Sequence, residues 1–174
     1  MLTDIAKQQL RKAGWYEGRK IDLTKFEEEY AKIGCEMFPA ARKFLEEYGD
    51  LDIQDKYIST ATYENGDHFI VINRSLIDVA YCCCPRDLKL EEMVDELFHQ
   101  KILRVGAIDQ GEMNIFISED GRFFTNWHSV GLWAENSDQL WNEYYGEDYG
   151  WATWDDLKSG KGRTMFKKEI EKYL

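Results

Sequence analysis

Apolar residues recur at the spacing of an amphipathic helix in three segments of the chain. In the first segment Leu2, Ile5, Ala6 and Leu10 would share one face, and Gly14 follows as a helix stop. The same spacing predicts helices over residues 2–13, 24–33 and 88–100. Helix start and stop signals complete the set with helices over residues 38–48, 136–145 and 165–174.

The middle of the chain has the composition of β-strands. Residues 57–72 are rich in β-branched and aromatic side chains on both sides of Asn65-Gly66, a dipeptide that supplies the positive φ angles of a tight hairpin turn. Three further strands are predicted over residues 102–108, 113–118 and 122–127. Helices at the two ends and hairpins between them do not alternate as βαβ units would. The predicted fold class is therefore α+β: an antiparallel sheet of about five or six strands with helices mainly on one face.

Length and composition indicate a protein that folds as one unit. The 174 residues predict a single domain over residues 1–174, with a C-terminal helical extension over residues 158–174. A content of 44% hydrophobic and 14% aromatic residues with only 2 prolines is too rich in packing side chains for a disordered chain.

Cellular location and partner class follow from cysteine usage and charge. The first residues hold no apolar signal segment, and three of the four cysteines are consecutive, which is not a spaced disulfide framework. We therefore expect a cytoplasmic protein. The net charge of −11 argues against nucleic acid or an anionic membrane as a partner and favours a basic one.

Candidate metal ligands do not assemble into a site in the sequence. Three adjacent cysteines, Cys82, Cys83 and Cys84, cannot all reach one tetrahedral ion, and we expect thiols that pack as small hydrophobic groups. Glu96 and His99 have the spacing of a di-iron ligand pair, but such bundles need this pair twice. Glu91, Glu92, Asp95 and Glu96 form the polar side of the predicted helix 88–100, and this side is interpreted as a solvated face.

Catalytic motifs are also missing. Residues 158–164 resemble a phosphate-binding loop only superficially, because Asp155 stands where an earlier glycine is required. Neither a nucleophile elbow nor a zinc-hydrolase or dinucleotide-binding motif occurs in the chain. We predict no catalytic residue, no metal and no cofactor.

One stretch combines acidic and aromatic residues. Residues 127–157 hold seven Asp or Glu and no Lys or Arg, a net charge of −7, together with five of the six tryptophans. Tryptophan and tyrosine dominate interface hot spots, and carboxylates around them steer a cationic partner. The alternative is that these rings belong to the core. The residues expected to contact a partner are Trp133, Glu135, Asp138, Trp141, Glu143, Tyr144, Tyr145, Glu147, Asp148, Tyr149, Trp151 and Trp154.

Several short motifs resemble those of a known family. They are, in order, Ala13-Gly14-Trp15, Gly18-Arg19, the run of residues 44–51, Val105-Gly106, the strand pair around Asp120-Gly121, and Val130-Gly131. Over residues 10–145 the chain resembles the third subgroup of the SUKH superfamily of immunity proteins. The resemblance implies an α+β fold, no enzyme activity, and binding to a toxin domain of a polymorphic or contact-dependent system.

The leading hypothesis is an immunity protein that neutralises a cognate toxin domain, expected to be a basic nuclease. It would act as a monomer or weak homodimer. Two alternatives stay open: a scaffold domain with no toxin partner, and a metal-assisted hydrolase that uses a carboxylate pair such as Glu135 and Asp138.

Overall fold

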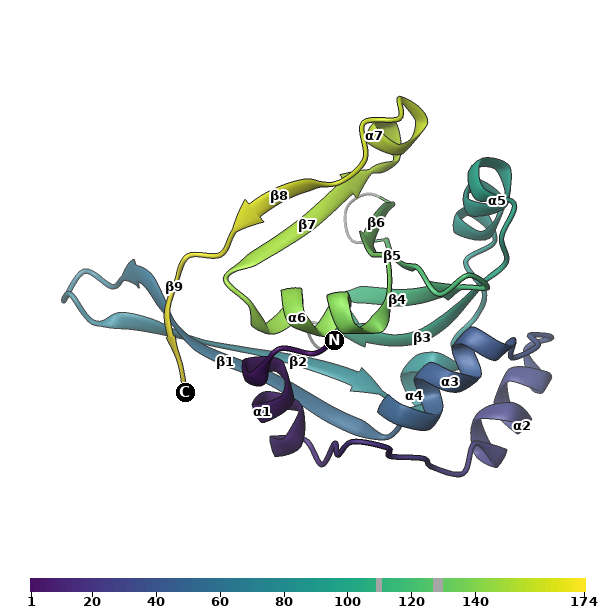
Figure 1. Cartoon of the computed structure of the whole chain (residues 1–174), viewed down its shortest axis with the longest axis horizontal. Coiled ribbons are helices and arrows are strands. Elements are labelled where there is room, and N and C mark those ends of the chain that lie inside the picture. Colours follow the sequence, from purple (N-terminus) through teal and green to yellow (C-terminus); the bar gives the residue numbers. More distant parts are fainter. Residues whose placement is uncertain (109–110, 127–129) are drawn as a thin grey trace.

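The structure is a computed structural model that describes residues 1–108, 111–126 and 130–174. This part of the chain is an α+β fold in which seven helices accompany a curled antiparallel sheet of nine strands (Figure 1). The helices are α1 (Asp4–Lys12), α2 (Thr24–Lys32), α3 (Pro39–Tyr48), α4 (Val79–Cys82), α5 (Leu88–Phe98), α6 (Ser137–Tyr145) and α7 (Trp154–Lys158). The strands are β1 (Leu51–Thr62), β2 (His68–Ile77), β3 (Ile102–Ile108), β4 (Met113–Ser118), β5 (Phe123–Thr125), β6 (Gly131–Ala134), β7 (Asp148–Thr153), β8 (Thr164–Lys167) and β9 (Ile170–Tyr173).

The predicted fold class is confirmed, and so are five of the six predicted helices. The predicted hairpins correspond to β1–β2 and β4–β5, while Trp127 and His128 lie outside the described residues. The expected five or six strands is too low a number, since the described residues form nine.

The predicted helix over residues 165–174 is wrong, and so is the helical extension over residues 158–174. Helix α7 ends at Lys158, and the chain continues as β8, which pairs with β7, and β9, which pairs with β1. These strands form through hydrogen bonds to segments that are distant in the sequence. The local spacing of apolar residues gives no information about such pairing.

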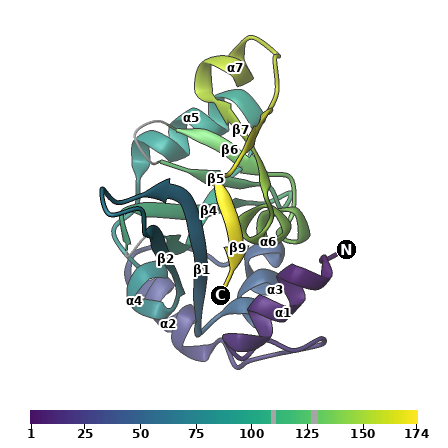
Figure 2. The ribbon, with the colours of Figure 1, turned by 90° about the vertical axis from the view of Figure 1, so that its left-hand side faces the viewer.

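The order of strands explains why the sheet curls. Strands β1 to β8 lie side by side in sequence order, and β9 returns to the free edge of β1, so β8 and β9 occupy opposite edges. Only residues 168 and 169 join these two strands, a link that spans roughly 10 Å at full extension. Nine strands side by side in a flat sheet would separate the edges by roughly 38 Å. The edges must therefore approach each other, and Figure 2 shows β9 beside β1.

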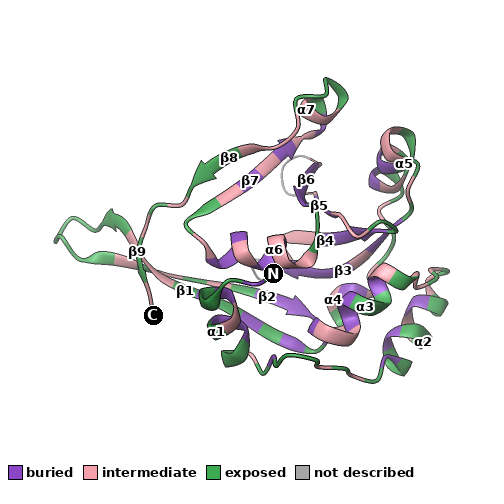
Figure 3. Ribbon diagram, viewed as in Figure 1, coloured by how far each residue is buried: buried purple, intermediate pink, exposed green. Residues whose placement is uncertain are grey.

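Central strands bury side chains on both faces, which creates two cores. Successive residues alternate between them: Phe123 contributes to one core and Phe124 to the other. The larger core receives side chains from α1, α2, α3 and α6, whereas Leu90 and Val94 of α5 and Trp154 of α7 pack into the smaller one. Helices thus lie on both faces of the sheet, but α1, α2, α3 and α6 share one face, which agrees with the expectation of helices mainly on one face. Figure 3 shows the buried residues concentrated in the central strands and on the inner sides of the helices.

An aromatic cluster forms the centre of the larger core. Trp141 of α6 is fully buried and lies against Phe44 and Tyr48 of α3, with ring centroids 6.3 and 5.4 Å away. Tyr144 meets the Trp141 ring edge-on at 5.7 Å. Such pairs add to the stabilisation that burial of the rings already gives.

A buried ion pair lies where the two sheet edges approach each other. Lys168, in the link between β8 and β9, has its Nζ 3.9 Å from Oδ2 of Asp55 on β1 and donates a hydrogen bond to the main-chain oxygen of Tyr144. The Asp55 carboxyl is buried, and its Oδ1 has no hydrogen-bond partner within the described residues. Burial raises the pKa of Asp55 to about 6, although Lys168 opposes the shift, and burial lowers the pKa of Lys168.

The aromatic cluster predicts a large effect for Trp141→Ala. Loss of a fully buried indole should lower the free energy of unfolding by about 3 to 5 kcal/mol, measured by urea denaturation with circular dichroism. Tyr16→Ala, at a position 58% exposed, is the control and should change it by less than about 0.5 kcal/mol. Equal unfolding midpoints for the two variants would contradict this placement of Trp141.

The Asp55 carboxyl predicts a pH dependence of stability. Because its pKa is about 6 in the folded protein and about 3.9 in the unfolded chain, the folded state binds more protons between these values. The contribution of Asp55 to the free energy of unfolding is therefore fully present at low pH and is lost as the pH rises through about 6. The free energy of unfolding of wild type minus that of Asp55→Asn should fall by up to about 3 kcal/mol from pH 4 to pH 7. Asp148→Asn, which removes an exposed carboxyl, should not reproduce this fall, and a difference that rises with pH would refute the assignment.

Candidate functional site: an acidic cleft beside helix α5

The structure separates the members of the acidic and aromatic stretch. Five of its rings are buried, two are half-buried, and Trp127 lies outside the described residues. The buried rings are Trp133, Trp141, Tyr144, Tyr145 and Trp154, and the half-buried ones are Tyr149 and Trp151. The expectation that rings and carboxylates face solvent together is wrong for the five buried rings, because they complete the two cores.

The carboxylates of this stretch differ in exposure as well. Glu135, Glu147 and Asp148 are exposed and Asp138 is half-exposed, whereas Glu143 is buried. Glu135 precedes α6 and Glu147 follows it, so a helix of 9 residues, roughly 14 Å long, separates the two groups. These carboxylates do not form one continuous patch.

Glu143 has a structural partner for each carboxylate oxygen. Oε1 accepts a hydrogen bond from Nε2 of Gln139 at 2.9 Å, and Oε2 accepts one from the main-chain nitrogen of Gly150 at 2.7 Å. Oε2 also forms an ion pair with Arg163, and each of these two side chains is only 10% exposed. The pair ties α6 to the β7–β8 hairpin.

A cleft of about 680 Å³ opens between the α2–α3 connection and α5. Its floor is apolar and comprises Met37, Phe38, Ile102 and Leu103. Its charged lining residues are Glu36, Arg86, Glu91, Glu92, Asp95, Lys101 and Glu119. They come from four segments: the α2–α3 connection, the segment preceding α5 together with α5, the start of β3, and the β4–β5 turn.

Helix α5 presents its carboxylates to this cleft because its other side is held in the smaller core. Leu90 and Val94 are buried, and Glu92 and Asp95 on the opposite side are exposed. The helix is capped at its start by Asp87, whose Oδ1 accepts a hydrogen bond from the Leu90 nitrogen at 3.1 Å.

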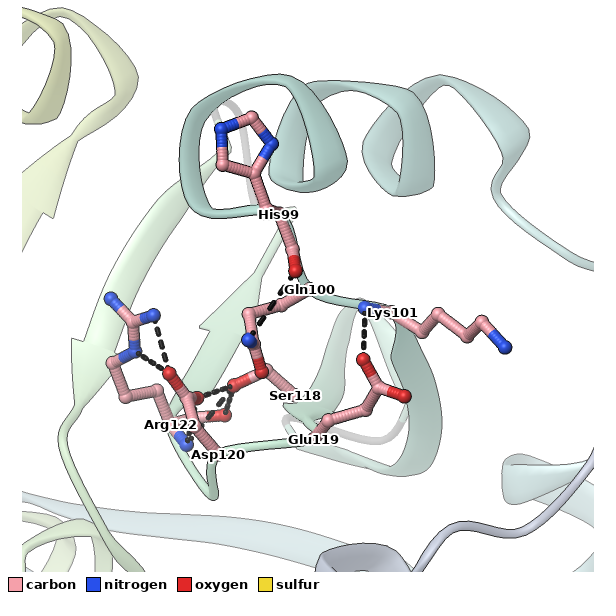
Figure 4. A network of polar contacts seen from close by, with 7 residues as sticks. All are labelled: His99, Gln100, Lys101, Ser118, Glu119, Asp120 and Arg122. Carbon is pink, nitrogen blue, oxygen red and sulfur yellow. Dashed lines mark hydrogen bonds and ion pairs between the residues drawn. The ribbon is translucent and has the colours of Figure 1, made fainter.

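The far end of α5 is fixed to the β4–β5 turn (Figure 4). His99 ends the helix in the left-handed conformation, with φ of 53°, and the chain then enters β3. The main-chain nitrogen of Lys101 donates to Oε2 of Glu119 at 3.0 Å, and the Glu119 nitrogen donates to the Lys101 oxygen at 3.1 Å. In the same turn Arg122 donates through Nε to Asp120 at 3.0 Å. Glu119 is therefore held at the rim of the cleft.

The cleft carries an excess of negative charge. It has five carboxylates and two cations, a net charge of 2 − 5 = −3. Arg86 forms an ion pair with Glu91, its Nε lying 3.0 Å from Oε1, while no ion pair within the described residues covers Glu36, Glu92, Asp95 or Glu119. An apolar floor with an acidic rim suits a partner segment that carries both an apolar and a cationic side chain.

Sequence reasoning did not find this site. The sequence places Glu91, Glu92, Asp95 and Glu96 on one side of α5, but their spacing alone indicates only a face exposed to solvent. Glu36 and Glu119 join it only through the fold. The spacing of charged residues along one segment could not show that three distant segments converge.

Cysteine and histidine residues form no metal site in the part of the chain that the structure describes, where no three potential ligands are suitably grouped. Cys82 is buried, and Cys35, Cys83 and Cys84 are half-buried free thiols. Burial raises the pKa of Cys83 to about 12, which disfavours a reactive thiolate.

The fold defines the class of protein: an α+β chain built on a curled antiparallel meander with helices on both faces. The model of the SUKH-3 immunity protein family matches residues 3–145, and the chain belongs to this family. Neither the curated protein sequences nor the solved structures contain a match. The matched region ends with α6, so β7, α7, β8 and β9 follow it. Among the described residues, no helix has the length and apolar character needed to span a membrane.

The environment of Glu143 predicts a structural effect. Glu143→Ala leaves the Arg163 guanidinium buried without its carboxylate and should lower the free energy of unfolding by about 3 kcal/mol, measured by urea denaturation. Glu135→Ala, at an exposed carboxylate, should change it by less than about 0.5 kcal/mol. Equal stability of both variants would show that the ion pair does not hold α6 in place.

Proposed function

We propose that this protein is a cytoplasmic immunity protein that binds and neutralises a toxin domain with a basic surface. Membership of the SUKH-3 immunity protein family supports the immunity role. The acidic cleft is the observation that carries the proposal of a basic partner, because it holds five carboxylates against two cations, and four of the carboxylates form no ion pair within the described residues.

A nuclease is the toxin class that this charge favours. A nuclease domain binds a polyanion through cationic side chains, and these side chains match a carboxylate-rimmed cleft. The net charge of −11 over the whole chain would attract such a domain from a distance. The protein would then inhibit by occupying the surface that the nucleic acid needs.

Binding is favoured over the metal-assisted hydrolase considered above. Glu135 and Asp138 lie at the start of α6 and belong to no group of three potential metal ligands within the described residues. A scaffold domain without a toxin partner would use the same kind of surface and differs only in the identity of its partner.

Co-expression tests the function directly. Toxin candidates are taken from the genes beside this one, and the domain used is one that arrests growth of a host cell when produced alone. Growth should recover when this protein is produced with that domain. An unrelated acidic protein of similar size is the control. Failure to restore growth while both proteins are present would overturn the immunity function.

The charge of the cleft predicts a salt-dependent association rate. Between about 50 mM and about 500 mM salt the rate constant for association with the purified toxin domain should fall roughly tenfold, measured by stopped-flow fluorescence. The dissociation rate should change less, because steering acts on the encounter. An association rate constant that is independent of ionic strength would contradict a charged interface.

A further inference from the structure

The acidic cleft has the two physical properties of a docking site for a short basic segment. Its hollow of about 680 Å³ has an apolar floor, which a side chain from a partner can cover, and its rim is acidic. Hydrophobic contact at the floor would supply affinity, and the rim would select the sign of the charge that enters.

Four rim carboxylates come from three parts of the fold and form no ion pair within the described residues. Glu92 and Asp95 lie on α5, Glu36 on the α2–α3 connection and Glu119 in the β4–β5 turn. Some surface carboxylates in the described part of the chain pair with cations, such as Asp52 with Arg74 at 2.6 Å. The four rim carboxylates do not, and they differ from other unpaired carboxylates in that they line one hollow. A cationic side chain between α5 and the opposite rim could contact carboxylates from more than one of these elements.

The rim is also preorganised. The pair of hydrogen bonds between Lys101 and Glu119 fixes the β4–β5 turn to the end of α5, and Asp87 fixes the start of that helix. The Glu119 carboxylate and the backbone of α5 are thus fixed before binding, which lowers the conformational entropy lost when a partner arrives.

From these observations we propose that the toxin domain docks in this cleft through a segment that places Lys or Arg side chains between α5 and Glu119 and an apolar side chain on Met37 and Phe38. This rests on the proposed function and specifies its interface. It assigns the main contact to the cleft and not to the acidic residues at the two ends of α6.

Charge reversal at the rim separates these surfaces. The test variant is Glu92→Lys with Asp95→Lys, two exposed positions that form no ion pair with any residue the structure describes. The matched control is Glu17→Lys with Glu64→Lys, which makes the same change of net charge at exposed positions outside the cleft. A third variant, Glu135→Lys with Glu147→Lys, reverses charge at the two ends of α6.

The probe is the purified toxin domain encoded beside this gene, and binding is measured by surface plasmon resonance. The rim variant should raise the dissociation constant at least about 100-fold, and the control should change it by less than about threefold. Circular dichroism and the urea midpoint should match those of wild type for each variant. Glu92→Gln with Asp95→Asn should show an intermediate loss, because it removes attraction without adding repulsion.

The outcomes are distinguishable. If wild type binds and neutralises the toxin but the rim variant binds as tightly as the control, the docking site is overturned while the immunity function stands. A larger loss for the variant at the ends of α6 also overturns it, in favour of that surface. If wild type does not bind the toxin domain at all, the proposed function fails and this interface fails with it.

Discussion

The burial of the central strands on both faces is the constraint on which the rest of the structure depends. A strand such as β5 places Phe123 in one core and Phe124 in the other, so neither face of the sheet can be left to solvent. Helices α1, α2, α3 and α6 cover one face, and α5 and α7 must cover the other. The position of α5 is thus a consequence of core packing. Because its apolar side is held against the sheet, its carboxylates have to point towards the cleft.

The second constraint is the closure of the curled sheet by the last residues of the chain. Strands β7, β8 and β9 follow the region matched by the SUKH-3 family, and they cover β6 at one side of the sheet and β1 at the other. The link between β8 and β9 places Lys168 beside the buried Asp55. A weak pair at 3.9 Å only partly offsets the cost of burying two charges, which is why the two pKa values shift in opposite directions towards neutrality.

Local patterns in the sequence predicted what depends on neighbours along the chain. Five helices and both tight-turn hairpins were predicted because apolar spacing and turn residues are local properties. The helix predicted over the last ten residues was wrong because the strand that holds Ile170 and Tyr173 forms by pairing with β1, a distant segment of the chain. The acidic cleft was not predicted for a similar reason. Glu92 and Asp95 lie on one predicted helix, but Glu36 and Glu119 come close to them only in the folded chain.

Composition and exposure carry different information about an interface. Residues 127–157 combine aromatic and acidic side chains because the stretch contributes to both core and surface: Trp141 of α6 lies in the aromatic cluster, whereas Glu135 and Glu147, at the two ends of α6, are exposed. The enrichment therefore reflects two layers that happen to share one stretch of sequence. In the cleft the opposite holds, since charges from distant segments meet over one apolar floor. The proposed interface rests on the second arrangement, because electrostatic attraction adds up among carboxylates that face the same volume of solvent.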